Sequence, residues 1–149
     1  MINSRRVLAF ALLSLLTTRG AAFAQTPAET AAEWGLLGTW RLDCSQPASP
    51  TDPDLTYVAR NGALFHDRNF GSTKDSNPVL SATTTASGGI EILVKFDPPG
   101  RTRQWTSIKR ADGRLRTVSN RNVDTDEYSI RDGKFVANGQ DAPWQTHCR

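Results

Sequence analysis

Apolar and polar residues alternate along short stretches of this chain, which is the pattern of half-buried β-strands. The clearest stretch is residues 90–97, whose apolar face carries Ile90, Ile92, Val94 and Phe96. Similar stretches recur roughly every ten residues and are separated by turn signals such as Asn61-Gly62. The pattern predicts an all-β domain of about eight antiparallel strands in up-and-down order, closed into a barrel.

The segments between the predicted strands are polar or rich in proline. Three prolines place residues 45–54 in a loop after a first strand at residues 38–44. Residues 71–78 are polar and are expected to form a second loop, before a strand at residues 79–86. The alanine-rich residues 26–33 are compatible with a short helix, and no helix is expected from Gly38 onwards.

The first 24 residues have the organisation of a secretory signal peptide. Arg5-Arg6 precedes an apolar run of ten residues, and Ala22-Phe23-Ala24 is a cleavage site of small residues. The run is shorter than the roughly 20 residues that a membrane span needs. We therefore expect cleavage after Ala24, a lead-in at residues 25–35, and a β-barrel domain at residues 36–149 that is periplasmic or secreted, without a membrane span.

The charge balance changes once this leader is set aside. The whole chain has 18 basic and 15 acidic residues, for a net charge of +3. Three of the arginines and none of the acids lie in the first 24 residues, so the remaining 15 bases equal the 15 acids. The overall basic balance is therefore no argument for a nucleic-acid partner.

Cys44 and Cys148 are the two cysteines of the chain. An even cysteine count in an exported protein predicts a disulfide. Such a bond brings two Cα atoms to within about 6 Å of each other. It would hold the first and last strands together, as closure of a barrel requires.

The sequence Gly38-Thr39-Trp40 at the start of the first strand resembles the opening of calycins, a group that includes lipocalins, avidin-like proteins and bacterial inhibitors of secreted metalloproteases. The resemblance implies a small barrel with Gly38 and Trp40 in structural roles, the tryptophan closing one end. Lipocalins hold small apolar ligands, and the inhibitors pair this opening with a nearby cysteine, as Cys44 does here. The Leu-Gly-Thr-Trp start and the cysteine near the end also resemble small exported proteins of alphaproteobacteria.

A basic segment at residues 95–121 contains eight bases and two acids. With Asp112-Gly113 as the turn of a hairpin, Lys109 would face Arg116 and Trp105 would face Asn120. Neither face of this hairpin is cleanly apolar, so it either lines a wet cavity or lies exposed to solvent. The candidate ligand-binding residues are Arg103, Trp105, Arg116 and Arg121, with Tyr57 and His66 as further candidates across the Asn61-Gly62 turn.

No catalytic motif and no free thiol nucleophile is recognised in the sequence, and no cofactor is expected. Two histidines at unrelated positions do not make a zinc site, so no metal is expected. We predict a non-catalytic exported protein that binds a small or anionic ligand. The alternatives are a protein–protein module, such as a protease inhibitor acting through residues 25–35, or an envelope protein without a small ligand.

Overall fold

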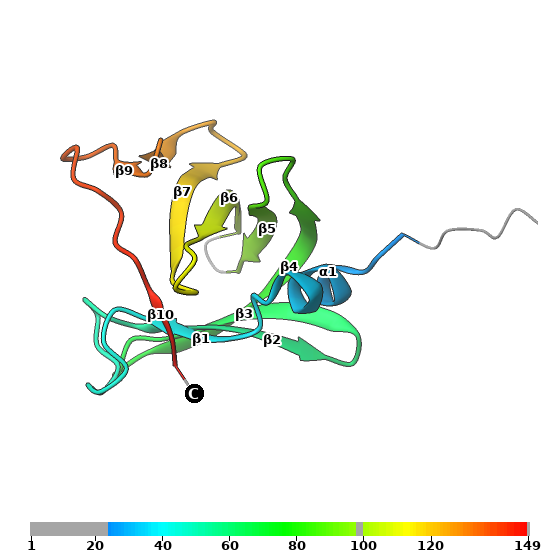
Figure 1. Cartoon of the computed structure of the whole chain (residues 1–149), viewed down its shortest axis with the longest axis horizontal. Coiled ribbons are helices and arrows are strands. Elements are labelled where there is room, and N and C mark those ends of the chain that lie inside the picture. The colour runs from blue at the N-terminus through cyan, green and yellow to red at the C-terminus, as the bar shows by residue number, and fades with distance from the viewer. Residues whose placement is uncertain (1–23, 98–99, 149) are drawn as a thin grey trace, which may run out of the picture.

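The computed structural model describes residues 24–97 and 100–148 (Figure 1). The predicted signal peptide therefore lies, up to residue 23, outside the described residues. The described part contains one helix and ten strands: α1 (Pro27–Trp34), β1 (Gly38–Arg41), β2 (Asp54–Arg60), β3 (Ala63–Asn69), β4 (Lys74–Thr84), β5 (Ile90–Phe96), β6 (Arg101–Lys109), β7 (Leu115–Asn122), β8 (Tyr128–Arg131), β9 (Lys134–Phe135) and β10 (Thr146–Cys148).

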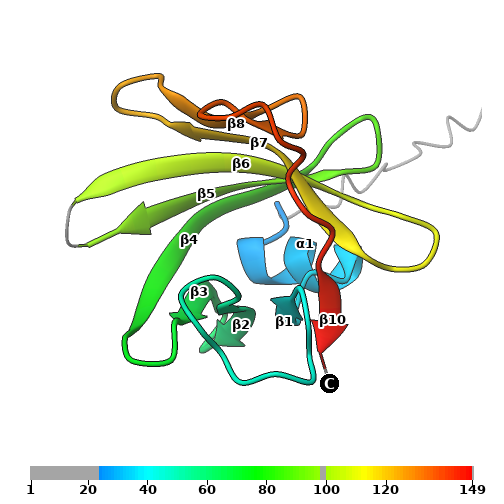
Figure 2. The same ribbon diagram turned by 90° about the vertical axis from the view of Figure 1, so that its left-hand side faces the viewer.

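The ten strands form one antiparallel sheet in the order β10-β1-β2-β3-β4-β5-β6-β7-β8-β9. Strands β1 to β9 follow one another in chain order, so the antiparallel all-β prediction is confirmed. The sheet is strongly curved, and the long strand β4 leads from the part formed by β1–β3 to the part formed by β5–β7 (Figure 2). The curvature makes one face concave, and this face holds most of the core.

The sheet does not close into a barrel by strand pairing. Its edge strands are β9 and β10, and β9 has only two residues, which is too short to continue the ladder. The chain between them, residues 136–145, crosses the open side of the curved sheet (Figure 1). We call this segment the C-terminal strap. At its end, Gln145 exchanges two backbone hydrogen bonds with Leu115 of β7, with N···O distances of 2.7 and 2.9 Å.

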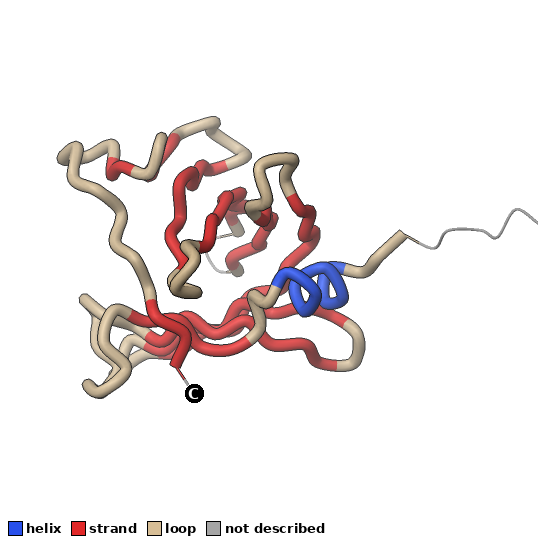
Figure 3. The backbone as a smooth tube through the Cα atoms, in the orientation of Figure 1, coloured by secondary structure: helices blue, strands red, loops and turns tan. Residues whose placement is uncertain are grey.

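Helix α1 closes one end of the curved sheet (Figure 3). Thr26 and Glu29 form a capping box, and Gly35 ends the helix in the left-handed region at φ +76°. The indole Nε1 of Trp34 donates to the carbonyl of Gly88 at 2.9 Å, in the turn between β4 and β5. Lys109 Nζ, at the end of β6, donates to the Trp34 carbonyl. The helix is therefore tied to the β4–β5 turn and to the end of β6.

The buried residues come from α1 and from the concave face of the sheet. In β5 the predicted alternation is confirmed, because Ile90, Ile92, Val94 and Phe96 are all buried. The other members of the core are Ala28, Ala31, Leu36, Trp40, Tyr57, Leu64, Val79, Trp105 and Leu115.

Trp40 is buried in β1, and its surroundings explain why residue 38 is a glycine. Its indole Nε1 donates to the carbonyl of Leu36 at 2.8 Å, and its ring packs on His147 with a centroid distance of 4.8 Å. Gly38 has φ +114°, and a Cβ atom at this position would lie 2.0 Å from His147 Nε2. A side chain at residue 38 is therefore excluded by both backbone conformation and space.

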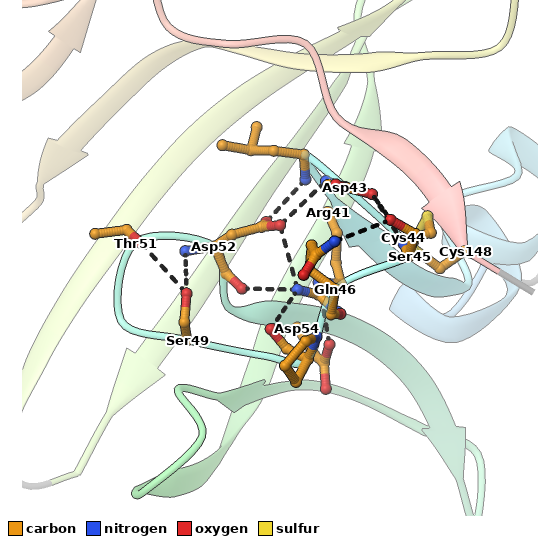
Figure 4. A network of polar contacts seen from close by, with 12 residues as sticks. Arg41, Asp43, Cys44, Ser45, Gln46, Ser49, Thr51, Asp52, Asp54 and Cys148 are labelled. Atoms are coloured by element: carbon orange, nitrogen blue, oxygen red, sulfur yellow. Dashed lines mark hydrogen bonds and ion pairs between the residues drawn. A yellow bond between two sulfur atoms is a disulfide. The ribbon is translucent and has the colours of Figure 1, made fainter.

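The Cys44–Cys148 disulfide is present, with a Cα–Cα distance of 5.5 Å. The pairing is as predicted, but the bond joins the β1–β2 loop, rather than the first strand itself, to β10, because β1 ends at Arg41 and not at Cys44. The same loop is organised by buried Arg41 (Figure 4). Arg41 donates to the carbonyls of Gln46 and Pro47 at 2.5 and 3.0 Å and forms an ion pair with Asp52 at 3.2 Å. The guanidinium thus replaces regular backbone pairing in a loop that its prolines keep out of the sheet.

Two details of the predicted strands are wrong. Residues 74–78 belong to β4 rather than to a loop. Their polar side chains bond to the neighbouring strand β3: Asp75 pairs with Arg68, and Asn77 Nδ2 donates to the His66 carbonyl at 3.2 Å. A strand held in this way has no apolar alternation in its sequence, which is why the pattern predicted a loop. In the β6–β7 hairpin, a bulge after Thr106 shifts the register.

The bulge removes the like-charge pair expected at the end of that hairpin. Lys109 lies opposite Leu115, and Arg116 lies opposite Ile108. Before the bulge the register is as predicted, with Trp105 opposite Asn120. A residue inserted in one strand changes the pairing of every residue beyond it, and the sequence contains no glycine that would mark the position.

Candidate functional site

A pocket with a volume of about 390 Å³ opens on the concave face, at the end of the sheet away from α1. Its position follows from the strand ends that line it: Phe96 ends β5, Arg101 begins β6, and Phe70 follows β3. The C-terminal strap and the last strands cover one side. The lining residues are Leu55, Tyr57, His66, Arg68, Phe70, Phe96, Arg101, Arg103, Trp105, Thr117, Asn120, Ser129, Ile130, Phe135, Ala142, Pro143 and Gln145.

The inner part of the pocket is a cluster of aromatic rings from four strands. His66 of β3 stacks on Tyr57 of β2 with a centroid distance of 4.7 Å, and it meets the edge of Trp105 at 5.3 Å. Phe96 of β5 lies 6.2 Å from Trp105. Tyr57 and His66 are directly opposite each other in the β2–β3 ladder, as the turn at Asn61-Gly62 predicted. These flat walls favour a flat, apolar ligand.

One hydrogen bond fixes the orientation of the two largest rings. The indole Nε1 of Trp105 donates to the hydroxyl oxygen of Tyr57 at 3.2 Å. Burial raises the pKa of Tyr57 far above its ordinary value, so the phenol stays protonated and neutral at physiological pH. The aromatic part of the pocket therefore contributes no negative charge.

The mouth of the pocket is basic. Arg68, Arg101 and Arg103 line it, and no acidic residue does. Arg68 is the one with a counter-ion: it forms an ion pair with Asp75 and lies over the ring of Phe96, 4.5 Å from the ring centroid. Its charge is therefore already partly compensated.

Arg101 and Arg103 have no such compensation. In the part of the chain that the structure describes, no carboxylate lies within 4.0 Å of either guanidinium. Arg103 is held by neutral partners: its Nε donates to Asn120 Oδ1 at 2.7 Å and its Nη2 to Ser129 Oγ at 2.8 Å. Burial, and then the positive charge of Arg101, lower the pKa of Arg103. Both effects mark a cation that lacks an anionic partner.

The structure brings together four of the six residues proposed from the sequence. Tyr57, His66, Arg103 and Trp105 all line the pocket. The two others lie elsewhere and have partners of their own. Arg116 Nη2 donates to the carbonyl of Gly133 and lies 3.4 Å from Asp141, and Arg121 pairs with Asp126 at 2.6 Å.

Sequence reasoning missed two arginines and two phenylalanines of the pocket. Arg68 and Arg101 were available to it, because each lies two residues from a predicted site residue and side chains two apart in a strand share a face. Arg68 follows His66 in this way, and Arg101 precedes Arg103. Nothing in the sequence marks Phe70 and Phe96 as pocket residues, since their apolar side chains have the pattern of ordinary core residues.

Comparisons with known proteins give no relative. No protein-family model matches the chain, and neither a curated protein nor a solved structure is significantly similar to it. The resemblance to calycins at Gly38-Thr39-Trp40 stays a prediction. The assignment of function must therefore come from the pocket itself.

Residues 24–97 and 100–148 contain no cluster of three or more histidine, cysteine or acidic side chains that could hold a metal ion. This part of the chain also has no helix with the length and apolar composition needed to cross a membrane.

His66 is a second buried titratable group of the pocket, beside Tyr57. Burial, with a smaller effect of the nearby Arg68 charge, lowers the pKa of His66 to about 3. The imidazole is thus neutral in the folded protein at neutral and weakly acidic pH. In the unfolded chain its pKa is about 6.5. Between pH 6.5 and 3 the unfolded state therefore binds a proton that the folded state excludes, and stability falls as the pH falls.

We expect this effect to be measurable by urea unfolding at pH 7 and pH 4. The wild-type protein should lose about 3 kcal/mol more of its unfolding free energy over this interval than His66→Phe, because only the wild type has the buried imidazole. The phenylalanine variant controls for the carboxylates that also titrate in this range. Equal losses in the two proteins would show that His66 is protonated without cost in the folded state.

Proposed function

We propose that the protein is an exported, non-catalytic binding protein for a small organic anion with a flat apolar body. The observation that carries this proposal is the pair Arg101 and Arg103, two guanidinium groups without a counter-ion at the mouth of an aromatic pocket that has no acidic lining residue. The anion would bind at these two arginines, and its apolar body would lie against Trp105, Tyr57 and His66.

The energetics favour an anion at this position. A guanidinium that is partly withdrawn from water, and that faces another cation, is stabilised when a negative group arrives. Hydrogen bonds between a guanidinium and a carboxylate or phosphate are roughly twice as strong as those between neutral groups. Arg103 is already held in place by Asn120 and Ser129, so little side-chain entropy is lost when the ligand binds.

The size and walls of the pocket fit a small molecule rather than a protein segment. A volume of about 390 Å³ lies within the usual range of ligand pockets, and such pockets combine apolar walls with a few polar groups. The site shows this combination: rings from four strands form the inner part, and the cations are confined to the mouth.

The proposed location is the periplasm or the exterior of the cell. The leader-like first 24 residues and the presence of the Cys44–Cys148 bond support it, since disulfides persist mainly in oxidising compartments. The alternative of a protease inhibitor is less well supported. Most of the segment that would act, residues 25–35, forms helix α1, whose residues Ala28, Thr30 and Ala31 are buried rather than presented to a partner.

The proposal is tested by a pair of ligands that share a ring system and differ in charge. We expect 2-naphthoate to bind at least tenfold more tightly than 2-naphthol, because only the carboxylate can pair with Arg101 and Arg103. Titration calorimetry at low and high salt measures both affinities, and the advantage of the acid should shrink as salt screens the charges. No binding of 2-naphthoate, or equal affinities for the acid and the alcohol, would contradict the proposal.

A further inference from the structure

The inner end of the pocket contains a polar group that the protein does not satisfy. His66 lines the pocket and is only 3% exposed. Its Nδ1 is buried without a hydrogen-bond partner, and the ring packs against the rings of Tyr57 and Trp105. The hydrogen bond recorded at this residue, from Asn77 Nδ2, goes to the backbone carbonyl.

An unsatisfied buried imidazole is costly. A neutral imidazole has one N–H donor and one nitrogen acceptor, and each loses its hydrogen bond to water when the ring is buried. Leaving a buried polar group without a partner costs stability, so nearly all such groups in folded proteins are paired. Phenylalanine would fill this position without that cost, so the histidine at residue 66 points to a partner that arrives from the pocket.

Strand geometry gives the approximate separation of the two polar ends of the site. The His66 ring meets Trp105, whose centroid is 5.3 Å away. Arg103 precedes Trp105 by two residues on the same strand face, and two residues of strand span about 7 Å. A ligand that contacts both His66 and the mouth arginines therefore needs polar groups at opposite ends of one or two fused aromatic rings.

The charge of the surroundings decides what the inner polar group is. The pocket has three arginines and no acidic residue in its lining. An ammonium group would be repelled by the arginines, and a second carboxylate would be desolvated among aromatic rings. A hydroxyl is neutral and can both donate and accept, so it matches a ring nitrogen of the imidazole in either tautomer.

Resting on the proposed function, we propose that the ligand is a hydroxyaryl carboxylate. Its hydroxyl, at the end of the ring system away from the carboxylate, hydrogen-bonds to the His66 imidazole, and its carboxylate pairs with Arg101 and Arg103. The ring system lies between these ends, against Trp105.

The test compares 6-hydroxy-2-naphthoate with 2-naphthoate on the disulfide-bonded protein. The two acids differ only in the hydroxyl at the far end of the rings. We expect the hydroxy acid to bind at least tenfold more tightly to the wild type, because it satisfies a group that is otherwise unpaired. In His66→Phe, which keeps a flat ring beside Tyr57, this preference should fall to less than twofold.

The outcomes separate this inference from the proposed function. If both acids bind equally to the wild type and both outcompete 2-naphthol, the anion site stands and the hydroxyl contact is refuted. If neither acid binds, both proposals fail. A tenfold preference that persists in His66→Phe would place the hydroxyl elsewhere and would also overturn the inference. If the variant does not fold, equal binding of the two acids to the wild type would still refute the hydroxyl contact.

Discussion

Removal of the Cys44–Cys148 disulfide will lower the free energy of unfolding by about 4–5 kcal/mol, the largest effect that we expect from any change in this protein. The bond joins residues separated by 104 positions, and cross-linking so long a loop removes much conformational entropy from the unfolded chain. For a domain of this size, the loss corresponds to a decrease of roughly 15 °C in the melting temperature.

The same change will weaken ligand binding. The strap contributes Ala142, Pro143 and Gln145 to the pocket, and the disulfide fixes β10, into which the strap continues. Without that bond, the strap is held to β7 by the backbone bonds between Gln145 and Leu115 and by the contacts of Arg116 with Asp141 and Trp144. If the strap has to become ordered when the ligand binds, the conformational entropy that it loses lowers the affinity.

Differential scanning calorimetry of the wild type, with and without reductant, measures the effect on stability. The double variant Cys44→Ser with Cys148→Ser is the control: it should melt like the reduced wild type and should not respond to reductant. A shift of less than about 3 °C would mean that the bond contributes little and that the sheet and strap are held together without it.

Reversing the charge at the mouth of the pocket will nearly abolish anion binding. We expect Arg103→Glu to weaken the affinity for 2-naphthoate by a hundredfold to a thousandfold, because it removes a charge-assisted hydrogen bond and places a carboxylate beside the ligand's own. Titration calorimetry at low salt measures the change, and the melting temperature reports whether the variant is folded.

Arg114→Glu is the matched control, since it makes the same charge change in the same β6–β7 hairpin. Arg114 does not line the pocket, and it pairs with Asp112 at the turn of the hairpin at 3.0 Å. We expect its effect on the affinity to stay within about threefold, the size of a screened long-range interaction. Equal losses in both variants would indicate a diffuse electrostatic effect and would refute the specific role of Arg103.

The fold class could be predicted because hydrophobic alternation and turn chemistry are local properties of the sequence. The face of β5 that carries Ile92 and Val94 is buried as the pattern requires, and the turn at Asn61-Gly62 sets Tyr57 opposite His66. The closed barrel could not be established in this way. Closure depends on whether the last strands are long enough to pair with β10, and β9 ends after two residues.

The site was only partly predictable, for a physical reason. The pocket is lined by residues that are far apart in the sequence, such as Arg68 and Arg103, and the curvature of the sheet brings them to one end. Arg103 and Arg116 looked equivalent in the sequence, because both belong to the same basic hairpin. In the structure they differ, because the bulge after Thr106 shifts the register at Arg116 and because the two side chains lie in different surroundings. Arg103 lines the pocket, whereas Arg116 pairs with Asp141.

The central claim is that Arg101 and Arg103 receive an anion at the mouth of the aromatic pocket. The most direct measurement is a crystal structure of the disulfide-bonded protein with 2-naphthoate bound. The predicted result is a carboxylate within hydrogen-bond distance of the Arg103 guanidinium, with the naphthalene ring against Trp105. The contradictory result is an empty pocket at saturating ligand, or a carboxylate bound at Arg116 or Arg121 instead.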